Sequence, residues 1–145
     1  MKDNRGFSLL ELLIVVAIIL IIATIAIPSL LRSRQAANET AAVATLKNMN
    51  TAEVTYSSAA AGGGIYATLA ELVAAGLVDS SLNSTKSGYN YGVVLSGNRL
   101  DYTLTAFAAA PTMGRFDYYT TPDYLIRFTS DTTRAPAGLA GEPVR

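Results

Sequence analysis

The sequence predicts an α+β protein in which one long N-terminal helix packs on a C-terminal antiparallel sheet of four strands. Three features support this class. Residues 12–31 form a run of 20 residues without a charge, and residues 32–60 continue as an alanine-rich segment with apolar residues at helical spacing. Residues 89–129 alternate apolar and polar side chains between turn sequences, which is typical of strands.

The apolar run has the length of a membrane span. At about 1.5 Å of rise per residue, residues 12–31 cover roughly 30 Å, the thickness of the hydrocarbon core of a bilayer. The run is apolar on every face, unlike the one-sided helix of an ordinary soluble domain. We therefore expect this helix to contact lipid, other copies of itself, or both in turn.

Glu11 is the one charge in residues 7–31. A carboxylate within a membrane helix costs free energy and calls for a partner, even when it lies about one turn from the helix end. The nearest cations, Lys2 and Arg5, belong to the short segment before Phe7. That segment has the look of a removable leader, so a neighbouring copy of the chain is the expected source of positive charge.

Residues 6–11, in one-letter code GFSLLE, together with the apolar run and Pro28, resemble the N-terminus of type IV pilins and pseudopilins. The resemblance implies that a prepilin peptidase removes residues 1–6 by cleaving between Gly6 and Phe7. It also implies N-methylation of the new N-terminal Phe7, and pairing of Glu11 with the amine of Phe7 on an adjacent subunit. Electrostatics favours that pair, because opposite charges attract strongly in a low-dielectric bundle whereas either charge alone is penalised.

The resemblance further implies the pilin fold, which divides the chain into consecutive segments. After the leader, residues 7–31 form the transmembrane and assembly half of one helix, and residues 32–60 form its amphipathic half. Residues 61–129 form a globular α/β head, and residues 130–145, which lack periodicity, form an exposed and partly mobile tail. The leader is too short for a secretory signal, so we expect the apolar run to be retained after cleavage.

Pro28 lies near the end of the span, where it removes one backbone donor and crowds the carbonyl of Thr24. We expect a kink or a locally unwound stretch at residues 22–29. A simple bend at the membrane exit is one explanation. The resemblance favours a segment that extends when a filament forms, which makes Pro28 a candidate assembly residue together with Phe7 and Glu11.

The segment after the span has one modest apolar face. Five apolar residues recur at spacings of four, three, three and four and so share a helix face: Ala42, Leu46, Met49, Ala52 and Tyr56. Four charged residues are available for the other faces: Arg34, Glu39, Lys47 and Glu53. We expect the apolar face to be buried against the head and the helix to end at the glycine run, residues 62–64.

A short second helix is predicted at residues 68–75. Thr68 and Glu71 have the spacing of a capping box, and Gly76 is suited to a C-terminal cap. Residues 80–87 are polar and rich in turn formers, so we expect a surface loop there.

Two hairpins are predicted after this loop. Four stretches have the strand pattern: residues 89–93, 101–108, 116–120 and 124–129. A turn at residues 96–98 separates the first pair, and a Pro122-Asp123 turn separates the second. These stretches supply the four strands of the expected sheet, one face of which packs on the long helix.

The composition argues against several classes of function. The chain has no histidine and no cysteine, so it lacks the commonest general base, the thiolate nucleophile and the commonest metal ligands. Lys plus Arg equals Asp plus Glu at 11 each, which leaves no basic excess to indicate nucleic acid. Asp117, Asp123 and Asp131 could bind calcium, but they form no compact run of ligands, and turn or strand-edge aspartates explain them better. We expect no enzyme activity, no catalytic residue, no cofactor and no metal.

The sequence therefore predicts a structural protein, the major pilin of a type IV pilus. Its expected partners are copies of itself, the prepilin peptidase, an assembly platform in the inner membrane, and the lipid bilayer. The precursor is expected in the inner membrane and the mature subunit in an extracellular filament. One alternative is a pseudopilin of a type II secretion system, in a periplasmic filament, although the chain lacks the tryptophan found in the major pseudopilin pattern. Another is a monomeric membrane-anchored binding domain, which would leave Glu11 unexplained.

Overall fold

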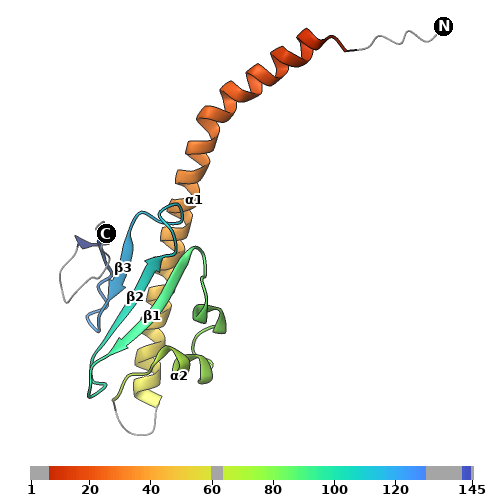
Figure 1. Ribbon diagram of the computed structural model, residues 1–145. Helices are drawn as coiled ribbons and strands as arrows, with labels where there is room; N and C mark the ends of the chain where they lie inside the picture. Colours follow the sequence, from red (N-terminus) through yellow and green to blue (C-terminus); the bar gives the residue numbers. More distant parts are fainter. Residues whose placement is uncertain (1–6, 60–63, 130–141, 145) are drawn as a thin grey trace. The chain divides into compact units, whose positions relative to one another are not determined.

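The computed structural model describes residues 7–59, 64–129 and 142–144 (Figure 1). The predicted leader with Gly6, most of the glycine run and most of the predicted tail lie outside the described residues. The described elements are helix α1 (Leu9–Ala59), helix α2 (Leu69–Ala74), the 3-10 helix η1 (Ser80–Asn83), and strands β1 (Tyr89–Leu95), β2 (Tyr102–Ala108), β3 (Asp117–Thr120), β4 (Arg127–Thr129) and β5 (Glu142–Pro143). This order confirms the predicted α+β class.

The chain divides into two compact units, residues 1–34 and residues 35–145, and α1 contributes to both. In the first unit, α1 stays helical at every position of residues 22–29, so the unwound stretch expected around Pro28 is wrong. Proline removes one helical hydrogen bond, and the turns on either side keep theirs. The Thr24 hydroxyl donates to the Ile21 carbonyl at 2.7 Å. A kink without unwinding stays a prediction.

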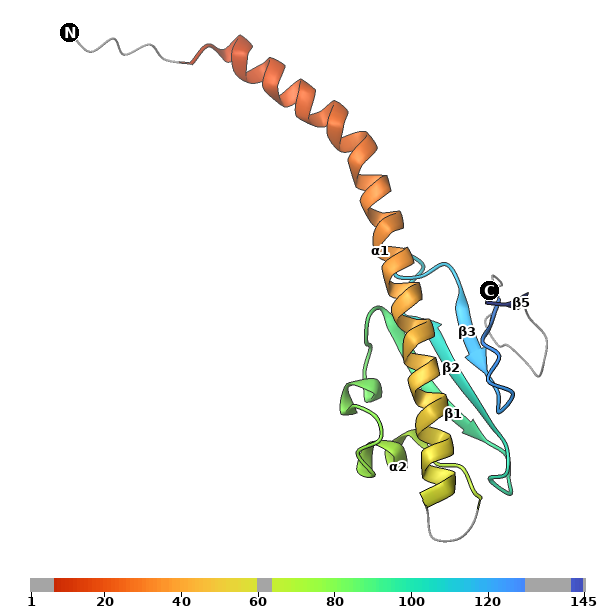
Figure 2. The same cartoon turned by 180° about the vertical axis from the view of Figure 1, so that it is seen from behind.

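In the second unit, which we call the head, α1 buries its predicted apolar face. Ala42, Leu46 and Met49 are fully buried and Ala52 is nearly so, whereas Tyr56 is half-buried against a smaller cluster. Figure 2 shows this part of α1 lying along β1 and β2. The apolar spacing read from the sequence therefore identifies the packed face correctly.

The assignment of Glu39 and Glu53 to the free faces of α1 is wrong, because both are buried. Glu39 holds Arg115: its Oε1 accepts from the backbone N–H and from Nε of Arg115, and its Oε2 accepts from Nη2, at 2.9–3.0 Å. Glu53 Oε2 accepts from the Ala67 N–H at 2.9 Å. Both carboxylates are therefore buried where groups from other parts of the head donate hydrogen bonds to them.

The loop between β2 and β3, residues 109–116, is fastened to the first turns of α1 within the head. Gln35 Nε2 donates to the Pro111 carbonyl and Asn38 Nδ2 to the Met113 carbonyl, each at 2.9 Å. With the Glu39–Arg115 pair, these bonds form a group that we call the loop clamp. It fixes a loop otherwise free of regular structure to the helix.

The helix α2 confirms the predicted capping box. Thr68 accepts from the Glu71 N–H and the Glu71 side chain accepts from the Thr68 N–H. Gly76 has a φ of 70°, and it donates to the Val73 carbonyl while Leu77 donates to the Leu72 carbonyl, which is the hydrogen-bond pattern of a Schellman cap.

The surface loop predicted at residues 80–87 is partly wrong, because its first four residues form η1. Asp79 caps this 3-10 helix by accepting from the Ser81 N–H at 2.6 Å. Leu82 is nearly fully buried, since η1 turns it into the main core. A single buried leucine in a polar stretch gives too little periodicity to indicate a helix.

The sheet is antiparallel throughout, and its strand order is β1-β2-β3-β4-β5. The first hairpin is as predicted, with Tyr89 opposite Ala108 and Leu95 opposite Tyr102. The second hairpin has a longer turn than expected, because β4 begins only at Arg127. Asp123 stabilises this turn by accepting from the Leu125 N–H and from the Thr121 hydroxyl.

A fifth strand corrects the predicted count of four. Glu142 and Pro143 pair with β4, and the Val144 N–H donates to the Ile126 carbonyl at 2.8 Å. This part of the predicted tail therefore has regular structure. Backbone groups form the pairing, so it leaves no alternation of side chains in so short a stretch.

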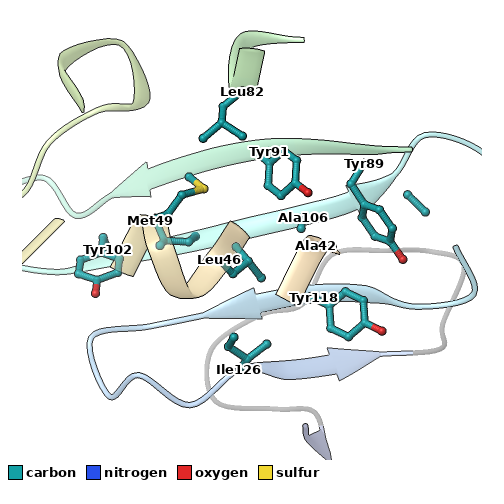
Figure 3. Close-up of a cluster of buried hydrophobic side chains, with 12 residues drawn as sticks. Ala42, Leu46, Met49, Leu82, Tyr89, Tyr91, Tyr102, Ala106, Tyr118 and Ile126 are labelled. Carbon is teal, nitrogen blue, oxygen red and sulfur yellow. The ribbon is translucent and has the colours of Figure 1, made fainter. Parts of the chain in front are cut away.

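The main core lies between α1 and the sheet (Figure 3). Tyrosines supply much of it: Tyr89 and Tyr102 are essentially fully buried, and Tyr89 packs against Tyr118 with ring centroids 6.0 Å apart. Two of the buried hydroxyls have partners, since Tyr102 donates to Asn50 Oδ1 at 2.9 Å and Tyr89 to the Phe116 carbonyl at 2.8 Å. The alternating tyrosines are therefore core residues, as their strand positions predict.

Candidate assembly segment at the N-terminus

The first unit exposes its apolar side chains on all sides. Every large apolar residue from position 7 to position 31 is at least 45% exposed. The helix is long and apolar enough to cross a membrane, a property that signal sequences share. Side chains of this kind are buried in folded proteins, so this surface needs a cover that one copy of the chain lacks.

Ser8 and Glu11 form a reciprocal cap at the start of α1. Ser8 Oγ accepts from the Leu10 N–H at 3.3 Å, and Glu11 Oε2 accepts from the Ser8 N–H at 2.9 Å. The Leu12 N–H then closes the first helical turn on the Ser8 carbonyl at 3.3 Å. This is the logic of a capping box, in which side chains satisfy backbone donors that a helix end leaves open.

The cap gives Glu11 a partner within its own chain, which the sequence reading missed. The signal was present, because Ser8 and Glu11 have the same spacing as Thr68 and Glu71. The cap also bends the carboxylate back toward the helix end. An oxygen of Glu11 is thus 2.9 Å from the nitrogen of Ser8, one residue from the predicted new N-terminus at Phe7.

Phe7 is 84% exposed and precedes the helix. Gly6 lies outside the described residues, so cleavage between Gly6 and Phe7 and methylation of Phe7 stay predictions. Pro28 is within α1, almost five helical turns from Glu11. The structure therefore brings Phe7 and Glu11 together at one end of the helix, and leaves Pro28 apart from them.

Two of the aspartates that were weighed as calcium ligands in the sequence have protein partners in the head. Asp117 accepts from the Ala108 N–H at 2.8 Å, and Asp123 pairs with Arg127. The hydrogen bonds and charge of Arg127 outweigh a smaller effect of burial and lower the pKa of Asp123 to about 2. Asp131 lies outside the described residues, and within those residues no cluster of three metal-ligating side chains occurs.

Comparison with known proteins agrees with the N-terminal assignment. Residues 1–27 match the family model described as the prokaryotic N-terminal methylation motif. The chain is 50% identical over 48 residues to the type IV wide pilus major component PilA4 of Thermus thermophilus, which covers 33% of this chain and 37% of that protein. It is 46% identical over 55 residues to the type IV major pilin protein PilA of Myxococcus xanthus, which covers 38% of this chain and 25% of that protein.

These matches span about a third of this chain and between a quarter and two fifths of the relatives' own length. No solved structure matches the chain. Both relatives are named as pilus subunits, not as enzymes. The resemblance predicted from Gly6, Phe7 and Glu11 is thereby confirmed: the N-terminal third of this chain is similar to part of two type IV pilins and begins with the methylation motif.

Proposed function

We propose that this chain is the structural subunit of a type IV pilus, cleaved between Gly6 and Phe7, methylated at Phe7, and polymerised through the first part of α1. One observation carries the proposal above the others. An apolar helix surface is exposed on every side, and its one charge, Glu11, lies at its start. The names of the relatives favour a pilus over the pseudopilus of a secretion system.

Insertion into a membrane and packing in a filament both remove this helix from water, so apolar burial does not by itself favour the filament over the membrane. Lipid tails are as apolar as leucine, and they offer a carboxylate no hydrogen-bond donor and no opposite charge. Within its own chain Glu11 has the Ser8 N–H as a donor, and a neighbouring subunit adds an opposite charge, because cleavage turns the Phe7 nitrogen of that neighbour into an ammonium group. The Glu11–Phe7 pair is therefore an interaction that favours the filament over the membrane.

The same pair sets the geometry of assembly. It joins the start of one helix to the start of the next, so each subunit donates through its Phe7 ammonium to one neighbour and accepts through its Glu11 carboxylate from another. A contact of this head-to-tail type that does not close on itself generates a helical fibre. The proposal places the prepilin peptidase and an inner-membrane assembly platform among the partners, with the precursor in the membrane and the mature subunit outside the cell.

Replacing Glu11 tests this role. Glu11→Gln keeps an acceptor for the Ser8 N–H while it removes the charge, so we expect normal insertion and cleavage but filaments reduced at least tenfold. Glu142→Gln is the matched control, because Glu142 is exposed on β5 in the head. Electron microscopy and immunoblotting of sheared cells measure the filaments, and mass spectrometry identifies Phe7 as the first residue. Wild-type filament yields from Glu11→Gln would contradict the pairing.

A further inference from the structure

We propose that a cleft in the head, between α1 and the chain that runs from the end of α2 through η1, binds one ring of a neutral sugar. The cleft has a volume of about 400 Å³, which is within the range of small-molecule sites. Figure 2 shows α2 and η1 on one side of the head part of α1. Every residue that lines the cleft belongs to the head, so the inference goes beyond the proposed function and does not depend on it.

The floor of the cleft is apolar and belongs to the packed interior of the head. It consists of five residues: Met49, Ala52, Leu77, Val78 and Leu82. Met49 is fully buried, and Val78 packs against both hydrophobic clusters of the head. Because the core holds this floor in place, a ligand binds without ordering it first, which lowers the cost of binding.

The polar groups of the cleft are mostly acceptors. Thr45, Thr51 and Thr55 each donate the hydroxyl proton to the carbonyl four residues earlier in α1, at 2.8–3.1 Å. Each of these oxygens therefore keeps a lone pair but has no proton to offer a ligand. Asp79 adds a carboxylate, which spends one lone pair on the Ser81 N–H and has about three others.

Asn48 and Lys86 supply the donors. Among the described residues, neither side chain has a hydrogen bond or a salt bridge. Hydrogen bonds from Ser81 lower the pKa of Asp79, and the charge of Lys86 lowers it further against a small effect of burial. Lys86 and Asp79 thus give the cleft one charge of each sign, and the lining is neutral overall.

This lining favours a neutral ligand that is rich in hydroxyls. A cation would be repelled by Lys86 and an anion by Asp79. A purely apolar ligand would leave the polar groups unpaired, which costs free energy. The hydroxyls of a sugar ring donate to the acceptors and accept from Asn48 and Lys86, while the C–H groups of the ring cover the apolar floor.

Nuclear magnetic resonance of the isotope-labelled full chain tests the site. The chain is held in a zwitterionic detergent, because a detergent with a sugar head group would compete. The probes are glucose, galactose, mannose, N-acetylglucosamine and N-acetylgalactosamine, together with the amino sugar and the uronic acid of whichever ring binds. We expect at least one neutral sugar to shift the side-chain amide of Asn48 and the backbone amides of residues 77–79 at millimolar concentration. The charged relatives should bind roughly tenfold more weakly.

Two variants show whether the sugar lies in the cleft. Asp79→Asn keeps an oxygen for the Ser81 N–H but removes the charged acceptor, and Asn48→Ala removes an exposed side chain. We expect the first to weaken binding roughly tenfold and the second about threefold, since hydrogen bonds to charged groups contribute more than neutral ones. Lys47→Gln, exposed on α1 and outside the cleft, is the matched control and should bind like the wild type.

Three results would overturn the inference. The first is that no neutral sugar shifts these amides, and the second is that a charged relative binds more tightly than its neutral parent. The third is binding that Asp79→Asn and Asn48→Ala leave unchanged, because the sugar would then lie elsewhere. The proposed function is not at stake in this test, since the proposed assembly uses the part of α1 before Gln35.

Discussion

At the scale of single residues, the glutamates of the helices share one behaviour. Each of the four accepts a hydrogen bond from a backbone N–H outside a regular helical bond: Glu11 from Ser8, Glu39 from Arg115, Glu53 from Ala67 and Glu71 from Thr68. Charged side chains are usually solvated, which is why the sequence reading placed Glu39 and Glu53 on free faces. Their donors lie 76 and 14 residues away along the chain, and no local pattern indicates such distant pairs.

Glu53 makes the stability of the head depend on pH. It is fully buried, its Oε1 has no hydrogen-bond partner among the described residues, and burial raises its pKa above 4.5 despite the Ala67 N–H and the charge of Arg99. Since the folded state then holds the proton more tightly than the unfolded state, the contribution of Glu53 to stability is greatest below pH 4.5 and is lost as the pH rises through the folded pKa.

Glu53→Gln removes the carboxyl group that binds this proton. We expect the free energy of unfolding of the wild type, from denaturant titrations in detergent, to fall between pH 5 and pH 7, and that fall to be smaller in the variant. Glu39 and Glu71 have lowered pKa values and change the slope only at lower pH, so the chosen range isolates Glu53. Glu142→Gln, on exposed β5, serves as the control and should keep the wild-type slope. Parallel profiles for wild type and Glu53→Gln would show that this carboxyl does not titrate in the range.

At the scale of elements, the sequence predicts best those that have local signals. The capping box of α2, the apolar face of α1 and the first hairpin all follow from residues within one turn or one alternation of each other. The misses have non-local causes. The 3-10 helix η1 depends on one buried leucine, and β5 depends on backbone pairing with β4, so neither leaves a periodic pattern in the chain.

The loop clamp is a contact between elements that makes stability depend on pH, through the pKa of Glu39. Burial alone would raise the pKa of Glu39, but the hydrogen bonds and charge of Arg115 lower it overall. A lowered pKa means that the stabilisation by this pair is fully present above pH 4.5, the ordinary value, and is lost as pH falls through the folded pKa. The side chain of Arg115 is 57% exposed, so solvent screening keeps the contribution modest.

We therefore expect Glu39→Gln to lower the free energy of unfolding by about 1–2 kcal/mol at pH 7, because charged hydrogen bonds are lost while the acceptor for the Arg115 N–H remains. Denaturant titrations measure the loss, and the gap between variant and wild type should narrow as the pH falls below 4.5. Lys47→Gln, on an exposed part of the same helix, is the control and should change little. A gap that is constant from pH 3 to pH 7 would contradict the ionic nature of the clamp.

At the scale of the whole molecule, the two units differ in whether their apolar side chains are exposed or buried. Residues 7–31 expose every large apolar side chain, whereas the head buries its core and begins its clamp at Gln35. The sequence analysis predicted that residues 7–31 expose apolar side chains to lipid or to other copies, because that run is apolar on every face. The cap that pairs Glu11 with the Ser8 N–H of its own chain was not predicted, although Ser8 and Glu11 have the spacing of a capping box.

Deleting residues 1–34 removes the apolar surface and spares the described core and the clamp. We expect the remaining head to be soluble without detergent, monomeric by light scattering, and as resistant to thermal unfolding as the head of the full chain. Deletion of residues 1–40 is the matched control, since it also removes Gln35, Asn38 and Glu39 and should lower the melting temperature. A head that still polymerised after loss of residues 1–34 would show that α1 before Gln35 is not the assembly surface.

Spatial and sequential order coincide in the sheet, where each strand pairs with the one made just before it. A ribosome or translocase that releases this chain from its N-terminus therefore delivers each described strand after β1 next to a strand that is already made. The head grows by accretion along one direction, and no strand has to wait for a partner from a later part of the chain. Among the strands that the structure describes, only β5 comes from the last residues, so a chain arrested before Glu142 would already hold the other four in place.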